Sequence, residues 1–276
     1  MEYCYLNGKV IKTKDATIDI YDIGFLRGYA VFDYIKAYNG TPFLLPEHLD
    51  RLDHSAKRFG MKVPLSHKKI TEIVTLLIKK NKAGTCAIRI VLTGGRAHGL
   101  EGDKYNPTFT VLIEPALPLP ETLYKKGGAL ITMEFNRSPW DAKHTNYSFA
   151  VSKQDDRKKA KAVEILYTWK GEVKEATTSN IFLIKNGKIF TPKEGVLFGM
   201  TRNFVVDLAK KNYPTVERKI VVKELISADE CFITATNKEV LPIVKIDGKI
   251  IGNGRVGPIT SAIMQSFKDV ITNLSN

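Results

Sequence analysis

Cysteine is scarce in this sequence, which has only Cys4, Cys86 and Cys231 among its 276 residues. Their number is odd and their spacing is wide, so the sequence predicts neither a disulfide framework nor a paired thiolate metal site. We expect the three side chains to pack as small apolar groups. The five histidines show no HExxH or similar ligand spacing, which argues against a metal centre.

Long hydrophobic runs are also missing. No stretch approaches the roughly 20 apolar residues of a membrane span. The N-terminal segment lacks the basic and then apolar pattern of a secretion signal. A chain of this length can bury one large core or two moderate ones. We therefore expect a soluble, cytoplasmic protein that has no membrane partner.

Acidic residues are outnumbered, with 29 Asp and Glu against 42 Lys and Arg, which leaves a formal net charge of +13. The lysines are scattered along the chain and form no basic block with interleaved aromatics. This distribution does not predict a nucleic-acid partner. A diffuse positive field would instead raise the local concentration of small anionic ligands.

Four turn signals divide the chain into hairpins. Each is an Asn-Gly or Asp-Gly pair between apolar or β-branched runs, the strongest short-range signal for a hairpin. They are Asn7-Gly8, Asn39-Gly40, Asn186-Gly187 and Asp247-Gly248. Strands therefore dominate the prediction.

A helix and a linker complete the expected organisation. Ser66 is a plausible N-cap for a helix with apolar residues at helical spacing, and residues 87–92 alternate as a strand. The segment Pro115–Glu121 is rich in proline, which pushes the preceding residues out of helical geometry. We predict a linker at residues 116–122, between a mixed α/β domain at 1–115 and a strand-rich domain at 123–276.

Lysine, tyrosine and carboxylate side chains gather in one part of the sequence. Lys143 and Tyr147 lie in the run Asp141–Tyr147, and Glu175 lies within Gly171–Asn180. A lysine whose pKa is lowered captures an aldehyde as a Schiff base. A carboxylate that faces a pyridine nitrogen keeps it protonated, and a tyrosine can donate to a ring oxygen. Each residue is ordinary alone, but together they are the groups that pyridoxal phosphate chemistry needs.

Two small-residue turns and an arginine are candidates for an anion site. Gly199, Met200 and Thr201 stand at the expected start of a helix, where unpaired N–H groups and the helix dipole favour an anion. A second turn is expected at Thr234–Asn237, after an apolar run. Arg51 lies on another predicted helix. These groups can together hold a phosphate.

Taken together and in their order along the chain, these motifs resemble those of the class IV aminotransferases, which are pyridoxal-phosphate enzymes of fold type IV. The likeness covers nearly the whole chain, from Asp22–Asp33 through His48–Leu52 to Gly254–Thr260. It implies an α+β, two-domain fold with a small α/β N-terminal domain, a larger strand-rich C-terminal domain and pyridoxal 5'-phosphate in the crevice. It implies that Lys143 is catalytic and that the cofactor is bound by Arg51, Tyr147, Glu175, Leu197, Met200, Thr201, Thr236 and Asn237. Two chains build each site in this family, so a homodimer or a higher homo-oligomer is expected.

The residues that hold the substrate carboxylate should indicate specificity. Branched-chain members carry a tyrosine before the glycine of the first motif, and a Tyr-Ile-Arg-Pro run on a strand. This chain has Arg27 before Gly28, and Ala87-Ile88-Arg89-Ile90 on the strand. Guanidinium groups bind carboxylates in a bidentate way, so Arg27 and Arg89 are a candidate carboxylate trap. The pattern is similar to a less typical group of D-amino-acid transaminases.

Arg96 and His98 are a second candidate carboxylate site. Typical D-amino-acid transaminases show an Arg-x-His pair in a loop and a tyrosine where this chain has Phe32. Arg96 and His98 imitate the pair, but their loop spacing differs and Phe32 lacks the hydroxyl, so we prefer the two-arginine interpretation. Asp33 replaces the family's common glutamate, and Tyr34 replaces the glycine of the branched-chain group, which narrows the pocket.

The sequence therefore predicts a transaminase. Its expected substrates are a D-amino acid of the D-alanine or D-glutamate type and a 2-oxo acid such as 2-oxoglutarate or pyruvate. Lys143 would form the Schiff base and move the proton. The alternatives are a branched-chain L-amino-acid aminotransferase and, further off, an aminodeoxychorismate lyase. A protein that only carries the cofactor is a non-enzymatic alternative.

Overall fold

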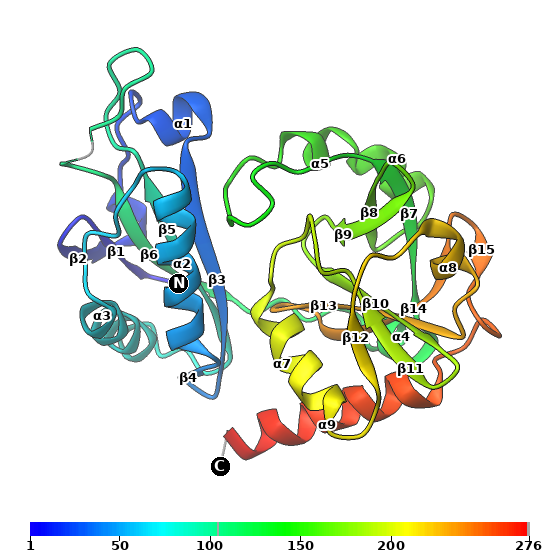
Figure 1. Ribbon diagram of the computed structural model, residues 1–276. Coiled ribbons are helices and arrows are strands. Elements are labelled where there is room, and N and C mark those ends of the chain that lie inside the picture. The colour runs from blue at the N-terminus through cyan, green and yellow to red at the C-terminus, as the bar shows by residue number, and fades with distance from the viewer. Residues whose placement is uncertain (104, 275–276) are drawn as a thin grey trace. The chain divides into compact units, whose positions relative to one another are not determined.

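The computed structural model describes residues 1–103 and 105–274 and divides into two compact units (Figure 1). Unit 1 comprises residues 1–117 together with 142–146, and unit 2 comprises residues 118–141 and 147–274. The first change of unit falls between Leu117 and Pro118, inside the range given above for the linker. The short segment 142–146 lies in the sequence of the second unit but groups with the first, which the sequence did not indicate.

Unit 1 is built on an antiparallel sheet of six strands in the order β2-β1-β6-β5-β3-β4. The strands are β1 (Tyr3–Leu6), β2 (Lys9–Lys12), β3 (Ala30–Tyr38), β4 (Thr41–Pro42), β5 (Cys86–Thr93) and β6 (Phe109–Pro115). The helices are η1 (Thr13–Asp15), α1 (Ile23–Arg27), α2 (Leu45–Arg58) and α3 (His67–Lys80).

The core of unit 1 lies between this sheet and helices α2 and α3. Ile35 and Ile88 are opposite each other on β3 and β5, and both are fully buried against helix residues such as Leu52 and Leu77. Helix α3 begins where the sequence predicts, because the Ser66 hydroxyl accepts the Lys69 N–H at 3.3 Å. The strand expected at residues 87–92 is confirmed as β5.

Unit 2 contains a mixed sheet of nine strands in the order β12-β11-β10-β13-β14-β7-β8-β9, with β15 paired to β14. The strands are β7 (Gly128–Glu134), β8 (Glu164–Trp169), β9 (Glu172–Ala176), β10 (Asn180–Lys185), β11 (Lys188–Thr191), β12 (Thr215–Glu217), β13 (Glu230–Ala235), β14 (Glu239–Ile246) and β15 (Lys249–Ile250). The helices are α4 (Glu121–Lys126), α5 (Ser148–Ser152), α6 (Gln154–Lys159), α7 (Met200–Lys210), α8 (Val222–Ile226) and α9 (Pro258–Leu274). The expected α+β class is confirmed.

The four predicted hairpins are all present. They join β1 to β2, β3 to β4, β10 to β11 and β14 to β15. In each, both turn residues have positive φ, for example 44° at Asn7 and 94° at Gly8. This is the requirement of a type I′ turn, whose twist matches that of the flanking strands.

The three cysteines are free and buried, as the sequence predicts. Burial raises the pKa of the Cys231 thiol, which keeps it protonated and apolar. Among the described residues, no helix has both the length and the apolar character to cross a membrane.

A buried carboxylate holds the start of the last helix. Glu230 on β13 accepts the backbone N–H of Ile259 at 3.1 Å and that of Thr260 at 2.7 Å. These donors belong to the first turn of α9 and have no partner within the helix. Gly257 makes this approach possible, since a Cβ on it would lie 2.0 Å from the Glu230 Cδ.

Replacing Gly257 by alanine should therefore destabilise unit 2. The added methyl forces Glu230 away from α9, and overpacking of this kind costs about 1–3 kcal/mol. We expect a lower midpoint of denaturant unfolding for Gly257→Ala. Gly84→Ala is the control, because a Cβ there meets nothing within 4 Å; equal midpoints for the two variants would contradict the explanation.

Candidate active site

Lys143 is held on the edge of the sheet of unit 1. Strand β3 pairs with β4 only at Ala37 and Tyr38, so its first residues present an open edge on that side. The segment 142–146 fills this edge: the Phe32 N–H donates to the Lys143 carbonyl at 3.0 Å, and Val31 forms an antiparallel bridge with His144. These bonds place Lys143 in unit 1, whereas the sequence assigned it to the larger domain.

A second contact fixes the lysine backbone. The Lys143 N–H donates to the hydroxyl of Ser55, which is fully buried on α2, at 3.0 Å. The Lys143 Nζ lies 4.6 Å from the centre of the Phe32 ring. The amine thus rests over an aromatic face while both backbone groups of the residue are hydrogen-bonded.

Asp33 is a fully buried carboxylate that pairs with Arg51. Its carboxylate receives Arg51 Nε at 2.9 Å and Arg51 Nη2 at 2.8 Å, and His48 Nδ1 lies 2.6 Å away. Burial alone would raise the pKa of Asp33, but the Arg51 charge and the His48 contact hold it well below its usual value. Asp33 therefore stays ionised and orients the guanidinium group of Arg51.

His48 contributes as a neutral donor. Burial lowers its pKa, against the opposing pull of Asp33. A carboxylate only accepts hydrogen bonds, so the Nδ1 that contacts Asp33 is the nitrogen that carries the proton. His48 and Arg51 lie three residues apart on α2 and so share a face of that helix.

Arg89 lies close to the same aromatic ring as Lys143. It is opposite Tyr34 in the register of β5 and β3, and its guanidinium lies 4.9 Å from the Tyr34 ring centre and 5.7 Å from that of Phe32. It makes a two-point ion pair with Glu114 at 2.6 and 3.0 Å. Arg89 is thus on the face opposite the buried Ile88, as the strand alternation predicts.

The other arginine candidates have different surroundings. Arg27 ends α1 and is exposed, and its described hydrogen bond is to the Leu26 carbonyl at 3.4 Å. Arg96 pairs with Asp19 and lies 4.8 Å from the Tyr21 ring centre. The backbone of His98 pairs with Glu101, at 2.8 and 3.1 Å. No described contact joins Arg27 to Arg89, or Arg96 to the His98 side chain.

Glu175 is the buried carboxylate of unit 2. One oxygen accepts Arg137 Nε at 2.7 Å, and the other accepts the Leu197 N–H at 2.8 Å. Arg137 also donates to the carbonyls of Pro139 and Trp140. A carboxylate has about four acceptor positions, so this pairing orients Glu175 without using its full capacity.

Tyr147 is a protonated phenol in the same unit. Burial raises its pKa to about 12, and the Glu175 charge adds to this, while Arg137 acts in the opposite direction. At neutral pH its oxygen therefore keeps a proton to donate. Sequence reasoning missed Arg137, which has no local pattern to distinguish it from a surface arginine.

Helix α7 begins at the predicted anion site. Gly199 is the N-cap and supplies no side-chain cap to the first turn. A Cβ at Gly199 would lie 2.3 Å from the Asn180 Oδ1, so only glycine fits this approach. Thr201 is buried in the first turn. The backbone donors there suit a phosphate.

The second predicted turn is shorter than expected. Thr234 and Ala235 are the last residues of β13, and the turn itself begins at Thr236. The small side chains of Thr234 and Ala235 suggested a turn, but both are buried in the sheet, so β13 extends through them. Thr236 and Asn237 remain the turn residues.

Comparison with known proteins agrees with these groups. Residues 30–246 match the family model of class IV aminotransferases. A putative branched-chain-amino-acid aminotransferase of Methanocaldococcus jannaschii is 38% identical, with 97% of this chain and 96% of the relative covered. A D-alanine aminotransferase of Listeria monocytogenes is 33% identical, with 97% and 95% covered. The solved structure of an Escherichia coli branched-chain amino acid aminotransferase superposes with a TM-score of 0.90 at 26% identity, covering 100% of this chain and 96% of that one.

The chain belongs to the class IV aminotransferases. Its cofactor is pyridoxal 5'-phosphate, and its substrates are amino acids and 2-oxo acids. Each unit contains groups that fit this cofactor: unit 1 has an amine, and unit 2 has a buried carboxylate, a protonated phenol and a helix N-terminus for a phosphate.

Removing the Asp33 charge should destabilise the protein at neutral pH. Asp33→Asn leaves Arg51 buried without its counter-ion, which costs about 3–5 kcal/mol. Because the native pKa lies below the unfolded value of roughly 4, the wild-type advantage is complete above about pH 5 and declines as acid protonates the native carboxyl. Unfolding free energies of both proteins across this range would measure the decline.

Asp155→Asn is the matched control, because Asp155 is exposed and its pair with Lys158 is long, at 3.8 Å. It should leave the unfolding free energy nearly unchanged at every pH. A wild-type advantage over Asp33→Asn that grew in acid would refute the assigned charge state.

Proposed function

We propose that this aminotransferase moves an amino group between a D-amino acid, of the D-alanine or D-glutamate type, and a 2-oxo acid such as 2-oxoglutarate or pyruvate. Two observations support this. Lys143 and Arg89 approach the same Phe32 ring, at 4.6 and 5.7 Å from its centre, which suits a substrate carboxylate of either class. Arg27 and Ala87 stand where the branched-chain enzymes carry tyrosines, which favours the D-amino acid. A carboxylate held by Arg89 would place the neighbouring Cα within reach of the lysine amine.

The site residues divide the work of holding the cofactor. Lys143 would attach it by its amine and move the proton at the substrate Cα. Glu175 would face the pyridine nitrogen, and Tyr147 would donate to the ring oxygen. We assign the phosphate and the ring's flanks to Arg51, Leu197, Met200, Thr201, Thr236 and Asn237. When bound, pyridoxal 5'-phosphate accepts the amino group and delocalises the charge that develops at Cα.

The proposed specificity depends on arginines and on missing tyrosines. Arg89 stands where the branched-chain Tyr-Ile-Arg-Pro run also has arginine, so it serves either substrate class. The preference for a D-amino acid over a branched-chain L-amino acid therefore depends on Arg27 and on the absence of the two tyrosines. Glu114 accepts Arg89 Nε at 2.6 Å and Arg89 Nη2 at 3.0 Å, and this two-point pairing fixes the plane of the guanidinium.

A branched-chain L-amino-acid aminotransferase is the second candidate. The specific observation in its favour is the 38% identity to the putative branched-chain-amino-acid aminotransferase of Methanocaldococcus jannaschii. Tyr34 opposes it, because we expect its ring, 4.9 Å from the Arg89 guanidinium, to narrow the pocket for large apolar side chains. An aminodeoxychorismate lyase would release pyruvate and consume no 2-oxo acid.

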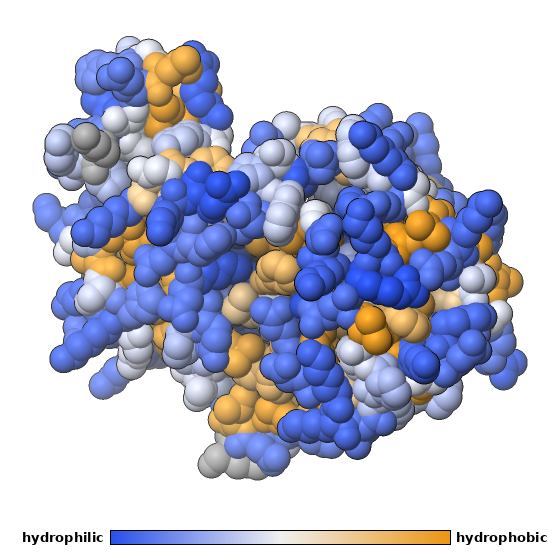
Figure 2. Space-filling view, in the orientation of Figure 1, coloured by the Kyte–Doolittle hydropathy of each residue, from blue (hydrophilic) through white to orange (hydrophobic). Residues whose placement is uncertain are grey.

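We also propose a homodimer. Large apolar side chains are exposed on unit 1 around α1: Ile18, Ile20, Tyr21, Phe25 and Leu26. Figure 2 shows hydrophobic surface at the end of unit 1 where Figure 1 draws α1. Contiguous exposed apolar surface is typical of an interface. Arg27 lies in this surface, so a second chain would cover it. A cytoplasmic location remains a prediction from the sequence.

Single half-reactions would test the substrate class. The protein loaded with cofactor is mixed separately with D-alanine, D-glutamate, L-leucine and L-glutamate, and conversion to pyridoxamine 5'-phosphate is followed by loss of the visible absorption. We expect faster conversion with the D-amino acids. Faster conversion with L-leucine would replace the proposal with the branched-chain alternative. Lys143→Ala should abolish conversion while it preserves the fold, as measured by circular dichroism.

Arg89→Ala and Arg27→Ala should each lower kcat/KM for D-amino acids about 10- to 100-fold, because a hydrogen bond to a charged group is worth about 1.5–3 kcal/mol. The effect should fall mainly on KM, since the carboxylate is bound before and during reaction. Steady-state kinetics with D-alanine would measure it.

Arg218→Ala is the matched control. Arg218 makes a comparable two-point ion pair with Glu224, at 2.7 and 3.2 Å, with similar exposure. It contacts the Phe190 ring and none of the site residues within the described part of the chain. If Arg218→Ala and Arg89→Ala change kcat/KM for D-alanine equally, Arg89 does not bind the substrate.

A further inference from the structure

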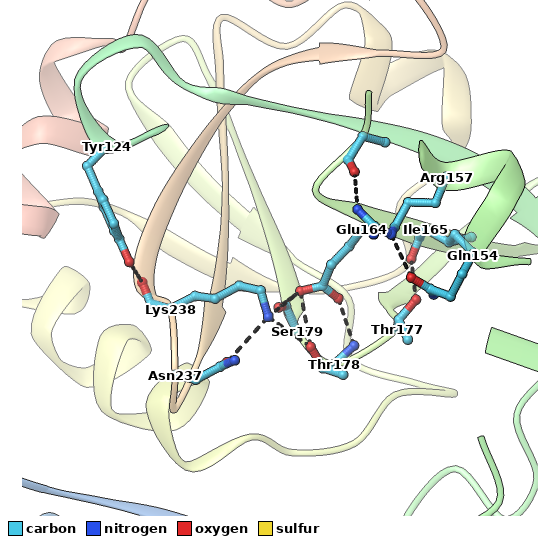
Figure 3. Close-up of polar contacts among 11 residues, drawn as sticks. Tyr124, Gln154, Arg157, Glu164, Ile165, Thr177, Thr178, Ser179, Asn237 and Lys238 are labelled. Atoms are coloured by element: carbon cyan, nitrogen blue, oxygen red, sulfur yellow. Dashed lines mark hydrogen bonds and ion pairs between the residues drawn. The ribbon is translucent and has the colours of Figure 1, made fainter. Parts of the chain in front are cut away.

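A buried ion pair lies in unit 2 close to the residues assigned to the cofactor. Glu164 begins β8 and Lys238 immediately precedes β14, and their exposed fractions are only 4% and 7%. The Lys238 Nζ lies 2.8 Å from Glu164 Oε1 (Figure 3). The lysine charge lowers the pKa of Glu164, against the effect of burial, so the carboxyl stays ionised.

Glu164 holds the loop that follows Glu175. Its Oε2 accepts the backbone N–H of Thr178 at 2.7 Å, and its Oε1 accepts the hydroxyls of Thr178 and Ser179. All of these donors are uncharged groups in residues 178–179, so the carboxylate determines the path of this loop (Figure 3). The loop comprises residues 177–179 and begins directly after β9 ends at Ala176, two residues after Glu175.

Lys238 joins that loop to the turn at Thr236. Its ammonium has three donors, and the structure shows three acceptors: Glu164 Oε1, Thr178 Oγ1 at 2.9 Å and Asn237 Oδ1 at 3.3 Å. Its carbonyl accepts the hydroxyl of Tyr124 at 3.1 Å. The ammonium is therefore fully satisfied and connects two separate segments.

The network continues to Glu175. Asn180, the next residue after the 178–179 loop, donates from Nδ2 to the Leu197 carbonyl at 2.7 Å. The Leu197 N–H in turn donates to Glu175 Oε2 at 2.8 Å. These two short bonds link the segment that follows Ser179 to Glu175 through the backbone of Leu197.

We infer that Lys238 is a positioning residue which, together with Glu164, holds the turn at Thr236–Asn237 against the loop at 177–179 and so shapes the cofactor site. The inference rests on the proposed assignment of Glu175, Thr236 and Asn237 to the cofactor. Lys238 itself touches neither substrate nor cofactor in this assignment; it acts through Asn237 and Thr178.

Stability alone does not explain such a pair. Two buried charges lose their hydration, and this loss roughly cancels their mutual attraction, so apolar residues of equal size often serve as well. What an apolar pair cannot do is accept the Thr178 N–H or donate to Asn237. The loop and turn would then be free to separate.

Four variants separate these roles: Lys238→Met, Glu164→Gln, the double variant Glu164→Gln/Lys238→Met, and Lys238→Arg. Melting temperatures of the apo proteins report on stability. Titration with pyridoxal 5'-phosphate, followed by absorbance, reports on cofactor affinity without relying on activity. Lys185→Met is the matched control, because Lys185 also bridges two segments, through Asp229 and the Ser227 carbonyl, but at the surface.

We expect Lys238→Met to lower both the melting temperature and the cofactor affinity, the latter on the order of 10- to 100-fold, as for loss of groups that orient ligands. In the double variant no uncompensated charge remains, so the melting temperature should recover while the affinity stays weak. Lys238→Arg should restore part of the affinity. Lys185→Met should change neither quantity.

Two results would overturn the inference. One is wild-type cofactor affinity in Lys238→Met, which would make the pair a structural feature alone. The other is recovery of affinity in the double variant, which would show that charge balance matters and positioning does not. Wild-type cofactor affinity in a Thr236→Ala variant would instead overturn the proposed assignment of this turn to the cofactor, and the inference with it.

Discussion

The backbone pairing between residues 142–146 and the open edge of β3 is the constraint on which the rest of the site depends. It delivers Lys143 to the ring of Phe32 and brings it near Arg89, which reaches that ring from the neighbouring strand. It also places the lysine backbone against Ser55, four residues after Arg51 on α2. Helix α2, the open edge of β3 and the neighbouring strand β5 therefore set the positions of Arg51, Lys143 and Arg89.

Buried carboxylates recur in this protein, and each is surrounded by more than one donor. Asp33 has Arg51 and His48, Glu175 has Arg137 and a backbone amide, and Glu230 has two helix amides. Each is an acceptor-only group whose burial is expensive without such partners. Because several partners share one carboxylate, each also ties together segments that are distant in the sequence. These buried carboxylates thus hold separate segments of the chain together.

Local chemistry was the predictable part of the structure. The four Asn-Gly or Asp-Gly turns and the Ser66 cap depend on residues within a few positions of each other, and their patterns are visible in the chain. The same is true of the helix start at Gly199. The pairing of residues 142–146 with β3 was not predictable, because it joins segments more than 100 residues apart through backbone bonds that carry no side-chain signal. Arg137, Glu114 and Lys238 share this difficulty: each is an ordinary charged residue until the fold supplies its partner.

The division of unit 1 into two pieces of sequence has a consequence for how the chain is made. During synthesis the first 117 residues emerge together, but the strand edge they contain stays uncovered until residue 146 has followed. An unpaired edge is a template for pairing with another chain, and domains generally fold as units while the rest of the protein is still being made. Nascent unit 1 therefore passes through an interval in which the edge that will receive Lys143 is open to pairing with another chain.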